Sequence, residues 1–438
     1  MNLFTRLLTL LLLLFVSTSA FSSSMSPGYA KAILEDERLD IVLKKAEEVL
    51  KSGATAGTSY GEVWIRDYAT FIEIACRVRD AESIKDDLLI FFKFQGEDGN
   101  IIDGYIPAEK ATGGYDYIES PLAPEYRAHK NTVETDQETS LVQAVYLYVK
   151  STGNRSILNE TIGGKTVLQR MEFALDFLLT HRFTDKYGLL WGATTADWGD
   201  VQPGHPWGVV IDESTKYCVD VYDNAMFLTA IDNFIALLDD DAQRAEKWQT
   251  VRDQTAANLQ KHLWDAANQK YYPHRYIDGS AFPDSFNEDE IFYFGGTACA
   301  ALAGVLSQDE LQQTLLQMKE RQASCGAATL GLTMYPPYPD GYFKNPSMRP
   351  YSYQNGGDWT WFGGRMIQAM IQYGRVQEAY DELKPMLDRV IANDDFYEWY
   401  DIYNQPRGAK NYRGSAGVLG KSILMLRELA DKQQAEAK

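Results

Sequence analysis

Helical segments recur along almost the whole chain, and this regularity restricts the possible folds more than any other feature. Apolar residues repeat at helical spacing, as in "RMEFALDFLLTHR", where Met171, Ala174, Leu175 and Leu178 share one face. Strand signals are scarce, so the sequence predicts an all-α protein. We expect helices over residues 38–52, 67–79, 82–95, 135–152, 165–182, 221–238, 242–263, 290–305, 308–321, 360–373, 376–392 and 413–433.

The connections between these twelve helices alternate between short and long. Asp80-Ala81 joins the second helix to the third, and Gly374-Arg375 joins the tenth to the eleventh. Twelve helices with such connections predict six hairpins closed into an (α/α)6 barrel, in which each hairpin buries its apolar face against its neighbours. The alternative is an open helical solenoid. No low-complexity linker interrupts the chain, so we expect a single domain over residues 21–438.

The N-terminal segment "MNLFTRLLTLLLLLFVSTSAFSSS" has the pattern of a secretory signal peptide. Arg6 precedes a mostly apolar run over residues 7–16, and the small residues Thr18 and Ala20 fit cleavage after Ala20. We therefore expect residues 1–20 to be a signal peptide and the protein to be secreted or periplasmic. An uncleaved anchor is the alternative, and no later stretch predicts a membrane span.

Charge and aromatic content narrow the class of ligand. The formal net charge of −19 disfavours nucleic acid and anionic membrane surfaces as partners, and a neutral substrate fits it better. Aromatic residues make up 13% of the chain, and many stand beside Gly, Asp and Asn in loops, where sugar-binding sites place stacking platforms. The cysteines Cys76, Cys218, Cys299 and Cys325 are too widely spaced for a zinc site and leave disulfides and buried thiols equally open.

The first two motif regions each place polar side chains at the start of a predicted helix. In residues 60–73, "YGEVWIRDYATFIE", Trp64, Arg66 and Asp67 could bind sugar hydroxyls, although an N-cap Asp beside a surface Arg is the simpler explanation. The acidic cluster in residues 134–138 would complement a helix dipole. Within it, Asp136 is the residue that we expect nearest a ligand.

The third region, "GATTADWGDVQP" at residues 192–203, holds two carboxylates around a tryptophan. Asp197, Trp198 and Asp200 fit neither a helical nor a strand period. A plain surface turn with Trp198 packed beneath it is one explanation. A loop that brings a carboxylic acid to a substrate is the other.

The fourth region, "YSYQNGGDWTWFGGR" at residues 351–365, combines a turn with aromatic residues. Asn355 begins the Asn-Gly-Gly turn signal, and Gln354, Asp358, Trp359 and Trp361 surround it. We expect all five residues to bind substrate.

Residues 396–417, "FYEWYDIYNQPRGAKNYRGSAG", follow with Glu398 between two aromatic residues. A carboxylate in such a frame is costly to bury without a partner or a function. The alternative is a Glu at an element end that points to water.

The remaining inventory of reactive groups excludes several chemistries. The sequence contains no G-x-S-x-G elbow, no H-E-x-x-H zinc motif, no P-loop and no G-x-G-x-x-G. What remains are carboxylates in aromatic loops. Glycoside hydrolysis needs one acid to protonate the leaving oxygen and one base to activate water, so these residues fit it and no cofactor is required.

Over residues 35–430 the chain resembles the six-hairpin (α/α)6 glycosidase superfamily. The segment Trp64-Ile65-Arg66-Asp67 is similar to the W-x-R-D segment of exo-mannosidases and neutral invertases. "ETDQETSLVQAVYLYVKSTG" resembles the acid-plus-helix segment that follows in those families, and "YQNGGDWTW" resembles a segment of invertases, disaccharide phosphorylases and debranching enzymes. "FYEWYDIYNQPRG" is similar to the C-terminal segment of trehalase and of glycoside hydrolase family 63 enzymes.

This resemblance implies catalytic roles for particular residues. Glu398 takes the place of the general base. The general acid falls in "TTADWGDVQP", where similarity to invertases favours Asp200 and similarity to trehalases leaves Asp197 open. The resemblance further implies inversion of the anomeric carbon, with either water or phosphate as the acceptor. A single pocket at the N-terminal ends of the inner helices would favour exo-action on a short substrate.

The predicted pocket lies at the N-terminal ends of the inner helices. Arg66, Asp67 and Asp136 would hold the sugar there. Tryptophans would stack on the sugar or form the walls, and they are Trp64, Trp191, Trp198, Trp207, Trp359 and Trp361.

Two other function classes remain open. A barrel-type sugar epimerase or polysaccharide lyase would use His205 or His129 as a proton shuttle. A non-catalytic carbohydrate-binding protein would bind sugar without turnover.

Overall fold

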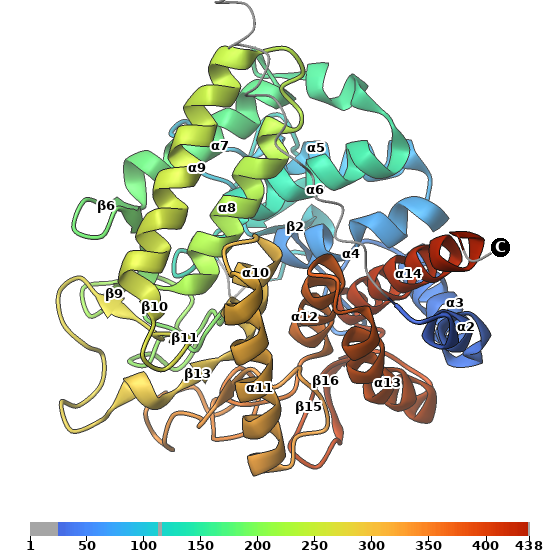
Figure 1. Cartoon of the computed structure of the whole chain (residues 1–438). Helices are drawn as coiled ribbons and strands as arrows, with labels where there is room; N and C mark the ends of the chain where they lie inside the picture. The colour runs from blue at the N-terminus through green and yellow to red at the C-terminus, as the bar shows by residue number, and fades with distance from the viewer. Residues whose placement is uncertain (1–24, 113–115, 437–438) are drawn as a thin grey trace, which may run out of the picture.

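The computed structural model describes residues 25–112 and 116–436, and this part of the chain contains thirteen α-helices (Figure 1). They are α2 (Pro27–Glu35), α3 (Glu37–Lys51), α4 (Ile65–Val78), α5 (Ala81–Lys93), α6 (Gln137–Thr152), α7 (Val167–His181), α8 (Val221–Ile235), α9 (Ala242–Leu263), α10 (Phe294–Leu302), α11 (Gln308–Cys325), α12 (Thr360–Gln372), α13 (Val376–Asn393) and α14 (Arg413–Glu436). The twelve predicted helices correspond to α3–α14, with ends displaced by a few residues.

Six helices form a closed inner ring. In the order α4, α6, α8, α10, α12 and α14, each packs against the next, and α14 returns to α4. The intervening helices form the outer layer, and Figure 1 places α9, α13 and α3 outside α8, α12 and α14. The prediction of an all-α (α/α)6 barrel is therefore confirmed. An open solenoid is excluded because the last inner helix contacts the first.

The seam between α14 and α4 depends on a close approach of the two backbones. A Cβ atom on Gly417 of α14 would overlap the backbone and Cβ of Phe71 on α4. Next to the seam, the Arg413 N–H donates to the Ala56 carbonyl at 2.7 Å. Any side chain larger than hydrogen at position 417 would push the first and last inner helices apart.

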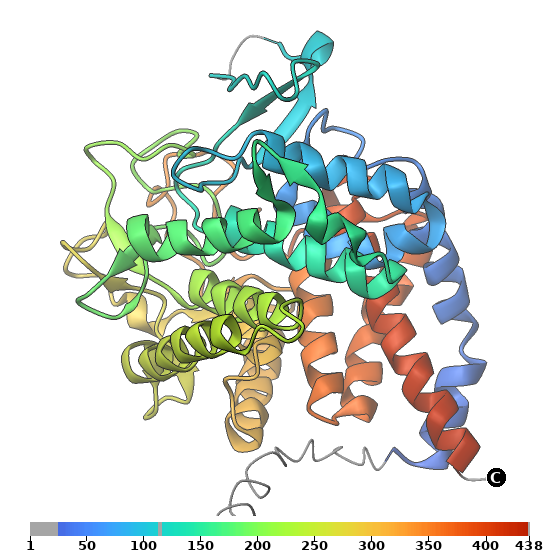
Figure 2. The same ribbon diagram turned by 90° about the horizontal axis from the view of Figure 1, so that it is seen from above.

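The outer helices begin where local sequence signals place them. Thr166 and Gln169 form a capping box at the start of α7, and Ser307 and Glu310 form another at the start of α11. Helix α2 was not predicted, because it has only nine residues and short helices carry a weak periodic signal. It packs against α14, and Figure 2 shows the first and last helices side by side.

Within residues 25–112 and 116–436, sixteen short strands line the connections, and most contain only two residues. They are β1 (Val63–Trp64), β2 (Gly104–Pro107), β3 (Tyr126–His129), β4 (Thr161–Ile162), β5 (Lys165–Thr166), β6 (Phe183–Thr184), β7 (Leu189–Leu190), β8 (Gly192–Ala193), β9 (Tyr217–Val219), β10 (Trp264–Asp265), β11 (Lys270–Tyr271), β12 (Arg275–Tyr276), β13 (Phe292–Tyr293), β14 (Met334–Tyr335), β15 (Tyr397–Tyr400) and β16 (Pro406–Lys410). Two groupings matter for the site, namely the antiparallel sheet β1-β2-β3 and the hairpin β15-β16.

Two predictions about the ends and the cysteines have different outcomes. The predicted signal peptide, residues 1–20, lies outside the described residues, so cleavage after Ala20 stays a prediction. Among the described helices, none is both long and apolar enough to span a bilayer. All four cysteines are free thiols, which decides between the two alternatives left open by their spacing.

Candidate active site

The N-terminal ends of the inner helices meet at one end of the barrel. Contacts between residues at these ends show the convergence. The Tyr222 hydroxyl at the start of α8 donates to Asp136 Oδ2 before α6 at 2.7 Å. The Tyr412 hydroxyl before α14 donates to Asp67 Oδ1 on α4, also at 2.7 Å. The motif regions therefore come together although they are far apart in sequence.

Glu398 stands on β15 with both carboxylate oxygens engaged. Its Oε1 accepts a hydrogen bond from the Tyr60 hydroxyl at 2.9 Å, and its Oε2 accepts one from the Ala409 N–H of β16 at 2.8 Å. Burial raises the pKa of Glu398 to about 7, while these two donors act in the opposite direction. The negative charges of Asp67 and Asp200 raise it further. The buried Glu398 carboxyl group therefore gains or loses its proton near neutral pH.

Gly408 makes room for this carboxylate. Its φ of +71° lies in the left-handed region, and a Cβ atom there would lie 2.9 Å from Glu398 Cδ and overlap Oε2. Only glycine therefore fits opposite Glu398 in the hairpin. The register of β15 against β16 also shifts between Tyr397 and Trp399, on either side of Glu398. Such an irregularity can redirect a side chain at a functional site.

Asp200 lies close enough to Glu398 for the two carboxyl groups to interact electrostatically. Its Oδ1 accepts a hydrogen bond from Gln354 Nε2 at 2.8 Å, and its Oδ2 accepts none from the described residues. The charge of Asp200 contributes to the raised pKa values of Glu398, Asp67 and Asp103. Asp200 therefore interacts with all three of these carboxyl groups.

Asp197 has a different environment from Asp200. Its oxygens accept hydrogen bonds from the Gly295 and Gly296 N–H groups at 2.7 and 2.8 Å, at the start of α10. Burial raises the pKa of Asp197 to about 8, and the two N–H donors oppose that rise. The residue adopts φ +55°, which is uncommon outside glycine. Asp197 thus attaches the loop to the positive end of α10.

Arg66 is paired with two acidic residues that precede helix α6. The Arg66 guanidinium contacts Glu134, and its Nε lies 2.7 Å from Asp136 Oδ2. Asp136 is fully buried, so in this structure it supports Arg66 and does not face open space. Burial raises the pKa of Asp67 to about 6, although the Tyr412 hydroxyl bond lowers it.

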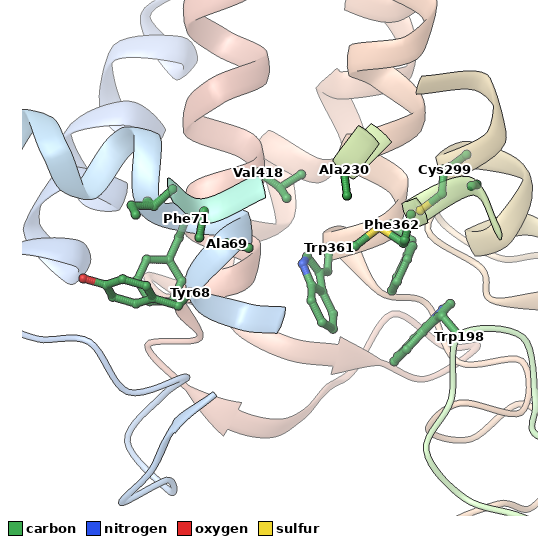
Figure 3. Close-up of a cluster of buried hydrophobic side chains, with 14 of the residues drawn as sticks. Tyr68, Ala69, Phe71, Trp198, Ala230, Cys299, Trp361, Phe362 and Val418 are labelled. Carbon is green, nitrogen blue, oxygen red and sulfur yellow. The ribbon is translucent and has the colours of Figure 1, made fainter. Parts of the chain in front are cut away.

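Three of the predicted stacking tryptophans form a buried aromatic cluster with Phe362. Trp198 stacks on Phe362 with ring centroids 4.4 Å apart, and it meets Trp361 edge-on at 5.6 Å (Figure 3). Trp198 also meets Trp359 edge-on at 4.7 Å. The indole N–H of Trp361 donates to Thr70 Oγ1 on α4 at 2.8 Å. All three tryptophan rings are buried, so they serve packing in this structure.

Several predicted site residues lie outside this group. Trp191 packs between Arg182 and Tyr217, Trp207 is 79% exposed on the loop surface, and Trp64 is half-buried against His129.

Two of the predicted polar residues have structural partners. Asn355 uses its amide to bond the backbone of Tyr338 and Met348, and Asp358 pairs with the buried Arg389 at 2.9 Å. A direct substrate contact by either would require these bonds to break.

The two histidines that epimerase or lyase chemistry would use each interact with other side chains. His205 Nε2 lies 2.6 Å from Asp212 Oδ2 and 3.2 Å from Ser214 Oγ, within the same surface loop. Burial lowers the pKa of His129 to about 4, and this ring packs edge-on against Trp64. The contacts described for His205 lie within its own loop and do not include Asp200 or Glu398.

The structure adds residues that motif analysis missed. Tyr60 and Tyr412 bind the two carboxylates Glu398 and Asp67 by hydrogen bonds, and Asp103 stands beside Arg66 at the start of β2. Tyr60 opened the quoted segment "YGEVWIRD", so its position beside the motif was a usable signal. Asp103, in "NIIDGYIP", had none.

The pKa of Glu398 leads to a prediction about pH. If Glu398 must be ionised, kcat/KM should fall about tenfold per pH unit below about pH 7. Tyr60→Phe removes a donor that favours the ionised form, so its acid limb should move to higher pH. Asp67→Asn removes a nearby negative charge, so its acid limb should move to lower pH. Measurement of kcat/KM against pH checks both signs, and shifts in the same direction would contradict the assignment.

The fold and the paired carboxylates define the class as an (α/α)6-barrel glycoside hydrolase. The model of the catalytic domain of the glycosyl hydrolase 94 superfamily matches residues 37–413, and the chain belongs to that superfamily. No curated protein matches the sequence.

Solved structures similar to this chain share its fold. A mannosylglycerate hydrolase of family GH63 from Thermus thermophilus, in complex with glucose, is 19% identical, with a TM-score of 0.60 over 87% of this chain and 99% of that one. An uncharacterized conserved protein from the same organism is 18% identical, with a TM-score of 0.62 over the same shares. A rhamnosidase from Klebsiella oxytoca with rhamnose bound is 14% identical, with a TM-score of 0.52 over 88% of this chain and 63% of that chain. At these identities the likeness establishes the fold alone.

Proposed function

We propose that the protein hydrolyses a terminal glycosidic bond of a short, uncharged carbohydrate with inversion of the anomeric carbon. Asp200 protonates the departing oxygen, and Glu398 removes a proton from the attacking water. The observation that supports this most is that Asp200 lies within electrostatic range of the buried Glu398 carboxyl group. The reaction needs two carboxyl groups, one as the acid and one as the base.

The base role of Glu398 rests on its partners. The Ala409 N–H can only donate, and the Tyr60 hydroxyl lies within donating distance of the other oxygen. Both contacts suit a carboxylate that accepts, and a protonated carboxyl would leave its proton without an acceptor at the Ala409 side. A raised pKa makes this carboxylate a stronger base than an exposed Glu.

The acid role of Asp200 rests on its free oxygen. Gln354 holds Oδ1, while Oδ2 accepts no hydrogen bond from the described residues and can carry the proton toward a glycosidic oxygen. Asp197 fits this role less well, because backbone N–H groups occupy both of its oxygens. We therefore assign the role of proton donor to Asp200.

Exo-action and the use of water as the acceptor are supported by separate observations. Exo-action is supported by the gathering of the candidate residues at one end of the barrel, where the N-terminal ends of the inner helices meet. The negative charges of Asp67, Asp103 and Glu398 would repel a phosphate dianion at short range, which favours water as the acceptor. The solved structures with this fold contain glucose, D-glycerate and rhamnose, which supports a carbohydrate as the substrate.

Export is a further part of the proposal. The charged, apolar and small-residue regions of residues 1–20 support a cleaved signal peptide. N-terminal sequencing of the protein from the culture medium or periplasm should start at Phe21.

The proposed reaction is tested by product stereochemistry. The purified protein is given a panel of nitrophenyl glycosides and disaccharides, with and without phosphate, and proton NMR follows the first product anomer. We expect hydrolysis without phosphate and the anomer opposite to that of the substrate. Retained configuration would contradict the roles of Asp200 and Glu398, and an absolute need for phosphate would replace water as the acceptor.

A further inference from the structure

Asp103 is held in place by its backbone from two sides. Its N–H donates to the His129 carbonyl of β3 at 3.0 Å, and its carbonyl accepts from the Ile65 N–H at the start of α4 at 2.9 Å. The preceding residues Ile101 and Ile102 are buried in the core. The position of this side chain is therefore fixed by the sheet β1-β2-β3 and by the first inner helix.

The carboxyl group of Asp103 has no hydrogen-bond partner among the described residues, although the residue is only 8% exposed. The two cations that its charge interacts with have other partners. Arg66 pairs with Glu134 and Asp136, and Lys130 Nζ lies 2.9 Å from Glu138 Oε1. Burial raises the pKa of Asp103 to about 7. Such a group destabilises the fold unless water or a ligand supplies the missing bonds.

Asp103 and Glu398 share Asp200 as an electrostatic neighbour. The charges that act on Asp103 include those of Arg66, Asp136 and Asp200, and the charges that act on Glu398 are those of Asp67 and Asp200. A sugar that brings its glycosidic oxygen to Asp200 would therefore come close to Asp103.

We propose that Asp103 is a recognition residue that binds a hydroxyl, or a pair of neighbouring hydroxyls, of the sugar in the pocket. A carboxylate can accept from two hydroxyls at once, and a protonated carboxyl can donate to one and accept from another. This inference rests on the proposed function, because it needs a sugar beside Asp200. It concerns substrate choice, and Asp103 takes no part in proton transfer to the glycosidic bond.

The first test compares Asp103→Asn with a matched buried carboxylate. Asp265 is also buried, but its oxygens accept bonds from Ala267 and Asn268 within its own turn. We expect Asp103→Asn to raise KM by ~10- to ~100-fold with a smaller change in kcat, and to leave the melting temperature unchanged or higher. Asp265→Asn should lower the melting temperature and leave KM unchanged. An unchanged KM with a lower melting temperature in Asp103→Asn would overturn the proposal.

The second test identifies the hydroxyl. Binding of the sugar that the enzyme releases, and of its monodeoxy analogues, is measured by calorimetry for wild type and Asp103→Asn; if no glycoside is turned over, glucose and rhamnose are used. We expect one deoxy position to weaken binding to wild type by ~10-fold and to leave binding to Asp103→Asn unchanged. Equal losses in both proteins at every position would sink the inference, as would a wild type that binds no sugar.

This design separates the inference from the proposed function. Sugar binding that depends on Asp103, in a protein that hydrolyses nothing, would leave the recognition role standing and remove the catalytic one. Hydrolysis that is unaffected by substitution of Asp103 would leave the catalytic role standing and remove the recognition role.

Discussion

Replacement of Glu398 by Gln should reduce kcat by roughly 10²- to 10⁴-fold while sugar binding persists, because the amide cannot take a proton from water. The side chain keeps nearly the same shape, and its carbonyl oxygen can still accept from Tyr60 or Ala409. Steady-state kinetics on the best substrate, together with binding of the released sugar by calorimetry, measures the two effects separately.

The structure offers a control for this substitution. Glu172 is another partly buried Glu with hydrogen bonds to both oxygens, from Trp248 and Arg244 in the outer layer. Glu172→Gln should cost stability and spare kcat. If Glu398→Gln turned over substrate at a near-normal rate, Glu398 would not be the base, and the water would need another activating group.

Replacement of Asp200 by Asn should reduce kcat by a similar factor on natural substrates, because the leaving oxygen loses its proton donor. The loss should be much smaller for a dinitrophenyl glycoside, since its weakly basic leaving group departs without protonation. Glu398→Gln should show no such relief, because its role does not involve the leaving group. Rates on a series of aryl glycosides of decreasing leaving-group basicity therefore distinguish the two roles.

Asp197 supplies the matched comparison on the same loop. Asp197→Asn places an amide against the Gly295 and Gly296 N–H groups, where one of the two acceptors is lost. It should lower the melting temperature and depress kcat on all aryl glycosides alike. If the rate loss depended on the leaving group in Asp197→Asn and not in Asp200→Asn, Asp197 would be the general acid and Asp200 would have the structural role.

The helices could be predicted from the sequence because their signal is local. Apolar periodicity and capping residues such as Thr166 and Ser307 act within a few positions. The two-residue strands were missed because each is defined only by its partner across space, as with Val63 and Tyr105. Helix α2 was too short to be recognised.

Parts of the site could be predicted for a similar reason. Arg66, Asp67, Asp200 and Glu398 stand in unusual local patterns, and the fold brings them together. Local patterns could not show that Trp198, Trp359 and Trp361 are buried against one another, because their contacts join segments far apart in the sequence. Asp103 was beyond sequence reasoning, because its missing hydrogen bonds exist only in three dimensions.

The closing contact between α14 and α4 also determines when the pocket comes into being. Glu398 meets Tyr60 across 338 positions, and Tyr412 meets Asp67 across 345. During synthesis the chain leaves the ribosome from its N-terminus, so Arg66 and Asp67 are made long before the residues that complete their surroundings. Nearly the entire polypeptide must be present before any catalytic geometry can form, so a nascent or prematurely terminated chain is inactive however much of its barrel has already folded.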